Sequence, residues 1–138
     1  MNYVPETKET TVRTGMSEVQ GLSIFYREAG KPGNPKLVLL HGFPASSHQY
    51  RNLIPALATK FHVVAMDYPG FGNSDMPDPA KYPYTFDKIS EVVEAFLKKR
   101  GFTRFGLRAG LRWAGGLSDP LAQPGLAGVV DHPEHQRL

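Results

Sequence analysis

The chain has 138 residues, of which 41% are hydrophobic and 21% charged, and it contains no cysteine. This is the composition of an ordinary globular protein, and the length suffices for one domain but not for two. The absence of cysteine excludes disulfides, zinc–thiolate and iron–sulfur centres and a thiol nucleophile. No apolar run approaches the roughly 18 residues of a membrane-spanning helix, and residues 1–8 lack the apolar stretch of a secretion signal, so the sequence predicts a cytoplasmic protein.

The charge of the chain gives little support for a nucleic-acid or membrane partner. The formal net charge is +3, and acidic residues are interspersed among the basic ones. The one tight basic run, residues 98–100, falls at the end of an expected helix, where the helix dipole favours cations. Because the sequence has no basic stripe, we expect neither partner.

Two short runs predict the centre of a parallel sheet. Residues 37–40 and 61–66 are almost entirely apolar, which is typical of strands covered on both faces. Residues 22–29 and 103–107 are rich in strand-forming side chains and are expected to form two further strands. Another strand is expected around residues 12–14.

Two helices are expected between these strands. Ser46 and Gln49 have the spacing of a capping box at the start of the first helix, and Pro55 should kink or end that helix early. Thr85 is expected to cap the second helix, and Gly101 to end it. The alternation of strands and helices predicts an α/β fold with a mainly parallel sheet and flanking helices.

The first candidate motif is the segment His41-Gly42-Phe43-Pro44, which lies between a buried strand and a capped helix. Gly42 permits a sharp turn and Pro44 fixes the path, so the N–H of Phe43 can point into the crevice at the carboxyl end of the sheet. An N–H held there can stabilise a developing oxyanion or hold a carboxylate. The alternative is a plain strand-to-helix turn with a structural histidine.

The second candidate motif is the loop that follows the next buried strand. Its notable residues are Asp67, Gly70, Gly72 and Ser74. The Gly-x-Gly pattern invites a dinucleotide-binding interpretation, but Asp75 stands where the third glycine would be, and prolines rather than a helix start follow. The alternative is a loop that is shaped by its glycines and braced by hydrogen bonds of Asp67 and Ser74.

Together, at this spacing, the two motifs resemble those of the α/β-hydrolase fold superfamily, and most of all its epoxide hydrolase and haloalkane dehalogenase branch. The resemblance covers residues 10–107. It implies that Phe43 supplies one oxyanion-hole N–H and lines the site together with His41, Gly42 and Pro44. It implies bracing roles for His41, Asp67, Gly70, Gly72 and Ser74. Many dehalogenases of the branch have asparagine where Phe43 stands, so the resemblance favours an epoxide hydrolase-like enzyme that needs no cofactor and takes a small-molecule substrate.

The catalytic groups that this resemblance implies are missing from the sequence. The nucleophile should follow the fifth strand directly, with an acid and a histidine later in the chain. The sequence contains neither Gly-x-Ser-x-Gly nor an elbow like Val-Gln-Asp-x-Gly-Gly. Asp119 and Asp131 are the only later aspartates, and no elbow glycines surround Asp119. His132 and His135 do not have the spacing of a His-Glu-x-x-His zinc site, so neither a catalytic nor a metal-binding residue is assigned.

The sequence changes character near residue 108. All eight lysines and every Phe and Tyr lie in residues 1–107, whereas residues 108–138 are rich in Gly, Pro, Ala and Leu without lasting periodicity. We expect residues 1–107 to be the N-terminal portion of a hydrolase domain, and residues 108–138 to be a disordered tail that does not belong to the family.

Two explanations of this tail stay open. One is a genuine flexible, low-complexity tail. The other is the right gene in the wrong reading frame. In one shifted frame, the codons from Arg108 permit Val-Gln-Asp-Tyr-Gly-Gly-Pro-Val-Gly, which is similar to the missing elbow. In the same frame, the codons from Asp131 permit Ile-Ile-Gln-Asn-Thr-Asn-Ala, which is similar to the next strand of the branch.

If the frame is shifted, the chain lacks nucleophile, acid, base and lid, and we expect an inactive fragment because these groups act as a unit. Its open sheet edge and exposed apolar faces favour self-association. The alternative function is a small non-catalytic α/β module that binds a ligand or a partner through the crevice at Phe43.

Overall fold

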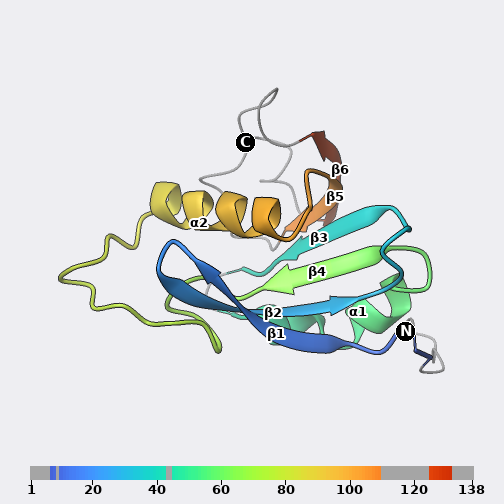
Figure 1. Ribbon diagram of the computed structural model, residues 1–138, viewed down its shortest axis with the longest axis horizontal. Helices are drawn as coiled ribbons and strands as arrows, with labels where there is room; N and C mark the ends of the chain where they lie inside the picture. Colours follow the sequence, from blue (N-terminus) through green and yellow to red (C-terminus); the bar gives the residue numbers. More distant parts are fainter. Residues whose placement is uncertain (1–6, 9, 43–44, 110–124, 132–138) are drawn as a thin grey trace.

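The computed structural model describes residues 7–8, 10–42, 45–109 and 125–131, and within these residues the chain forms one six-stranded sheet flanked by helices (Figure 1). The strands are β1 (Arg13–Val19), β2 (Leu22–Ala29), β3 (Lys36–Leu40), β4 (His62–Met66), β5 (Arg104–Ala109) and β6 (Gly125–Asp131). Their order across the sheet is β1-β2-β4-β3-β5-β6. Strand β3 pairs with β4 and β5 in parallel, whereas the pairs β1–β2, β2–β4 and β5–β6 are antiparallel.

The α/β fold predicted from the sequence is confirmed, and the expected parallel pairing is confined to the centre of the sheet. Strands β3 and β4 are buried along almost their whole length because each face of the sheet is covered by a helix (Figure 1). Val38, Leu40, Val64 and Met66 pack with helix α2 (Phe86–Lys99) on one face. The intervening residues point to the other face and pack with helix α1 (Leu53–Leu57); they are Leu37, Leu39, Val63 and Ala65.

Helix α2 begins and ends as the sequence predicts. The side chain of Thr85 accepts a hydrogen bond from the N–H of Lys88, at 3.1 Å, and so caps the helix. Lys98 and Lys99 occupy the last turn, and Gly101 follows with φ of +83°, a left-handed conformation that favours glycine. The buried face of α2 includes Ile89, Val92, Val93, Phe96 and Leu97.

The expected first helix is divided into two short pieces: the 3₁₀ helix η1 (Ser47–Tyr50) and α1. Pro55 explains the break, because its ring and missing N–H are tolerated only in the first turn of an α-helix, and α1 begins two residues before it. Ser46 is the N-cap as predicted, but its hydroxyl accepts from the N–H of His48, at 3.2 Å, and not from that of Gln49.

The edges of the sheet differ most from the sequence-based expectation. Strand β1 extends to Val19 and turns into β2 through Gln20 and Gly21, both with positive φ. Strand β5 continues to Ala109, beyond the expected end near residue 107. Residues 125–131, in the segment expected to lack regular structure, form β6 against β5.

Candidate functional site

Both sequence motifs lie at the carboxyl edge of the central strands. Strand β3 leads into His41 and Gly42, and strand β4 leads into Asp67. Because β3 and β4 are parallel neighbours, with Leu40 paired to Met66, the two motifs meet at one edge of the sheet. Phe43 and Pro44 lie outside the described residues, so the oxyanion role of the Phe43 N–H stays a prediction.

His41 is a fully buried link between the two motifs. Its Nε2 accepts a hydrogen bond from the N–H of Tyr68 at 3.3 Å, so its proton sits on Nδ1, which donates to the carbonyl oxygen of Gly42 at 2.8 Å. The hydroxyl of Tyr68 donates to the His41 carbonyl oxygen at 2.6 Å, and the two rings stack with centroids 3.8 Å apart. Burial lowers the pKa of His41, against the opposing effects of Gly42 and Asp67, and so favours the neutral ring.

The carboxylate of Asp67 joins the second motif to the segment that follows the first. Only 1% of the residue is exposed, and Oδ1 accepts from the N–H of Ser47 at 2.6 Å. The other oxygen, Oδ2, accepts from the N–H of Asn73 at 2.9 Å. One buried side chain therefore sets the distance between the start of η1 and the loop after β4.

Two glycines of this loop have no room for a side chain. Gly72 has φ of +53°, and a Cβ there would lie 2.1 Å from Asp67 Oδ2. Gly70 has φ of +85°, and a Cβ there would lie 2.7 Å from the ring of Tyr84. The loop thus needs glycine at both positions for backbone conformation and for space.

The same loop is hydrogen-bonded to strand β2. The hydroxyl of Ser74 donates to the carbonyl oxygen of Asp67 at 2.6 Å and accepts from the N–H of Phe25 at 2.9 Å. Asp75 Oδ2 accepts from the N–H of Ser23 at 2.8 Å, and its own N–H donates to the Ser23 carbonyl oxygen at 3.0 Å. The side chain of Asp75 therefore anchors the loop, a role that the sequence analysis missed.

Arg27 is a second residue that the sequence analysis missed. Its Nε donates to the hydroxyl of Ser47 at 3.0 Å, and its guanidinium carbon lies 5.2 Å from the centroid of the Phe25 ring. Ser47 is thus held through its N–H by Asp67 and through its hydroxyl by Arg27. No local signal identifies Arg27, because its partner is 20 residues away in the sequence.

The hydrogen bonds of the loop argue against the dinucleotide alternative. A phosphate-binding turn presents free backbone N–H groups to its ligand. Here four N–H groups of the loop are bonded within the loop itself; they belong to Gly70, Phe71, Asn73 and Ser74. The space at Gly72 and Gly70 is taken by the side chains of Asp67 and Tyr84 and is not left for a phosphate.

A pocket of about 460 Å³ lies between this loop and helix α2. Its lining comprises Gly70, Phe71, Met76, Pro77, Pro79, Tyr84 and Ile89. The Tyr84 hydroxyl donates to the carbonyl oxygen of Pro77, and both residues line the pocket. The volume falls within the range of small-ligand sites, and most of the lining side chains are apolar.

Comparison with known proteins decides the family. Residues 35–107 match the family model of the alpha/beta hydrolase fold. The chain belongs to the α/β-hydrolase family. It is 45% identical over 87 residues to an uncharacterized hydrolase, YNR064C, of Saccharomyces cerevisiae. The aligned residues make up 63% of this chain and 29% of the relative.

Two further comparisons include the expected branch. The chain is 35% identical over 111 residues to a soluble epoxide hydrolase of Corynebacterium sp., covering 79% of this chain and 36% of that protein. Its fold matches the crystal structure of the haloalkane dehalogenase DbeA from Bradyrhizobium elkani with a TM-score of 0.67 and 31% identity, covering 72% of this chain and 33% of that one. This α/β-hydrolase chain thus spans about a third of the length of the proteins it matches.

The remaining candidates of the sequence analysis lie in the C-terminal segment. Asp119, His132 and His135 are outside the described residues, and Asp131 is the last residue of β6. Within the described ranges, no three acidic or histidine side chains gather into a group that could hold a metal ion. No helix in that part of the chain is long and apolar enough to cross a membrane.

Proposed function

We propose that this α/β-hydrolase chain is the N-terminal portion of an epoxide hydrolase-like enzyme for a small-molecule substrate, and that the 138-residue chain itself does not turn over substrate. Its relatives that include an epoxide hydrolase and a haloalkane dehalogenase support the substrate class. The proposal includes a cytoplasmic location, no nucleic-acid or membrane partner, and self-association of the fragment.

One structural observation carries the proposed role of the first motif. The segment between His41 and Ser47 is held at both ends: His41 by the backbone N–H and the hydroxyl of Tyr68, and Ser47 by the carboxylate of Asp67. An oxyanion donor must be preorganised, and the bonds at these two ends support that role for the Phe43 N–H. Such preorganisation is what stabilises an oxyanion in the transition state.

The proposed inactivity rests on the sequence. Nucleophile, acid and histidine act as a unit in this family's chemistry, so an oxyanion donor alone supplies little rate. Neither elbow pattern is present in the chain. We therefore propose that residues 108–138 do not encode the family's nucleophile in the frame given.

A hydrolysis assay with a frame-restored control tests the proposal. The purified chain is incubated with an epoxide, a haloalkane and an ester, beside a heat-killed sample, and no turnover is expected. Sequencing of the gene across codon 107 tests the frame directly. If a shift is found, the restored full-length protein should hydrolyse at least one of the three substrates. Turnover by the 138-residue chain itself would refute the proposed inactivity.

The pocket beside α2 favours a second candidate function, that of a non-catalytic ligand-binding module. Its volume of about 460 Å³ and its apolar lining suit a small uncharged molecule. A small-molecule screen by thermal shift discriminates between the two functions. A ligand whose stabilising effect disappears in Ile89→Trp, which would fill the pocket, supports the binding module. Stabilisation that persists in that variant contradicts it.

A further inference from the structure

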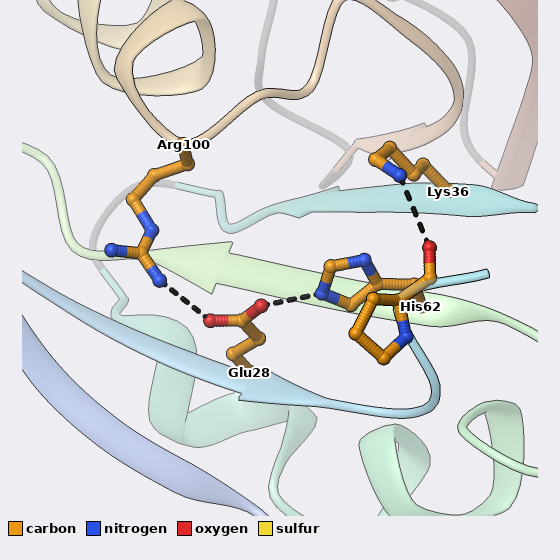
Figure 2. Close-up of polar contacts among 5 residues, drawn as sticks. Glu28, Lys36, His62 and Arg100 are labelled. Atoms are coloured by element: carbon orange, nitrogen blue, oxygen red, sulfur yellow. Dashed lines mark hydrogen bonds and ion pairs between the residues drawn. The ribbon is translucent and has the colours of Figure 1, made fainter. Parts of the chain in front are cut away.

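A cluster of three charged side chains lies at the end of the sheet opposite the candidate site. Glu28 stands near the end of β2, His62 begins β4, and Arg100 is the C-cap of α2. Figure 2 shows the Glu28 carboxylate between the His62 ring and the Arg100 guanidinium. The cluster thus joins two strands of the sheet to the end of the helix that covers them.

Both oxygens of the Glu28 carboxylate are used. Oε2 accepts from Nε2 of His62, and Oε1 accepts from a terminal nitrogen of Arg100 at 2.8 Å. The Glu28 side chain is only 12% exposed. Burial alone would raise the pKa of Glu28, but the hydrogen bonds and charges of His62 and Arg100 outweigh it and lower the pKa.

Each basic partner is packed against an aromatic ring that belongs to the core. The His62 ring lies 4.9 Å from the Phe102 ring, centroid to centroid, and Phe102 is fully buried between α2 and β5. The Arg100 guanidinium carbon lies 4.4 Å from the centroid of Tyr26. The ionic cluster and the aromatic packing therefore fix the same segment, residues 100–102, on the sheet.

Glu28 is the polar anchor of both bases. Nδ1 of His62 and Nε of Arg100 are buried, and neither has a hydrogen-bond partner among the described residues. If Glu28 became neutral, Arg100 would lose its charged partner in a position where solvent reaches it only in part. Neutralising one partner of a buried ion pair destabilises the fold by more than the pair's net contribution to stability, because the other charge is left uncompensated.

The other charged groups around this carboxylate are mostly basic. Arg13 is the cross-strand neighbour of Glu28 on β1, and Lys36 is that of His62 on β3, with its Nζ 5.7 Å from the Phe102 ring. On α2, Lys99 donates to a backbone carbonyl of β1, and Glu94 is the nearest acidic residue before Arg100 along the helix. The carboxylate itself is bonded to His62 and Arg100, so neutralising Glu28 acts directly on these two bases.

We propose that Glu28 is an acid-released clamp: its protonation detaches the C-terminal end of α2 and residues 100–102 from the sheet while the rest of the sheet stays folded. The geometry restricts the release to this segment, because one of the two bases that Glu28 holds, Arg100, belongs to it, and the other, His62, packs against Phe102. The centre of β3 has no such dependence, since Leu39 is buried in the apolar cluster on the other face of the sheet and β3 does not pair with β2.

Amide hydrogen exchange, measured by NMR and corrected for the intrinsic pH dependence of exchange, tests the proposal. The reporters are the N–H groups of Arg100 and Phe102, which donate to the carbonyl oxygens of Phe96 and Leu97 at 3.0 and 2.8 Å, and Leu39 is the reference. Between pH 7 and pH 3, we expect the protection of the two reporters to fall severalfold, mainly below pH 4.5 because the pKa of Glu28 lies below that ordinary value, and that of Leu39 to change little.

Two variants complete the experiment. Glu28→Gln should show low protection of the reporters at both pH values. Glu91 is exposed and forms an ion pair with Lys88 on the same helix, so Glu91→Gln should behave like the unmodified chain. A pH-dependent loss that persists in Glu28→Gln would overturn the clamp, as would an equal loss at Leu39 or no loss at all.

If Glu28→Gln does not fold, a measurement on the unmodified chain still tests the proposal. The ¹³C shift of the Glu28 side-chain carboxyl is followed over the same pH range. Its titration midpoint should coincide with the loss of protection at Phe102. Midpoints that clearly differ would overturn the proposal.

Discussion

Replacement of Gly72 by alanine isolates the tightest steric requirement of the candidate site. A Cβ at this position would lie 2.1 Å from Oδ2 of Asp67 and 3.0 Å from Cβ of Ser46. The Asp67 carboxylate must move, and it then loses a bond to the N–H of Asn73 or of Ser47, which costs about 1–3 kcal/mol for a buried group. The left-handed backbone adds about 1–2 kcal/mol for any residue with a Cβ. We therefore expect Gly72→Ala to lower the free energy of unfolding by about 2–5 kcal/mol.

Two other glycines serve as matched controls. Gly21 also has a positive φ, +79°, but a Cβ there would meet nothing within 4 Å, so Gly21→Ala should cost only the backbone contribution of about 1–2 kcal/mol. Gly33 has neither a positive φ nor a close neighbour, so Gly33→Ala should be close to neutral. Urea unfolding followed by circular dichroism measures all three variants. A Gly72→Ala variant no less stable than Gly21→Ala would refute the steric argument.

Three further predictions use the same unfolding assay. Ser74→Ala removes a buried hydroxyl that bonds Asp67 and Phe25, and should cost about 1–3 kcal/mol; an unchanged midpoint would contradict this role. Thr85→Ala removes the cap of α2, with an expected loss of about 1 kcal/mol; helicity should drop with it. Because the pKa of His41 is lowered in the folded state, its contribution is complete above about pH 6.5 and is lost as pH falls below that value; this slope should be absent from His41→Gln.

The helices and strands that could be predicted are specified by residues close to one another in the sequence. Helix α2 has a capping threonine, an apolar face and a terminal glycine within one short segment, and the structure follows all three. The buried strands β3 and β4 were predictable because helices cover both faces and select continuous apolar runs. Pro55 predicted a break in the first helix, but a proline does not determine whether the residues before it form a 3₁₀ helix.

The contacts that could not be predicted depend on partners distant in the sequence. Asp75 bonds Ser23 across 52 positions, and Arg100 bonds Glu28 across 72. Such pairs are set by strand register and helix placement, which no local pattern encodes. Of the site itself, residue types alone suggested that Asp67 and Ser74 could brace the loop, but not which backbone groups they would bond.

The loop after β4 is attached to strand β2, so the β1–β2 hairpin holds this loop in place as well as forming the edge of the sheet. Ser74 and Asp75 supply the bonding groups that Phe25 and Ser23 would otherwise seek from another strand. Removal of the β1–β2 hairpin would leave these groups without their partners, and the distortion would pass through Asp67 to the start of η1. The geometry of the candidate site in this chain thus depends on the β1–β2 hairpin.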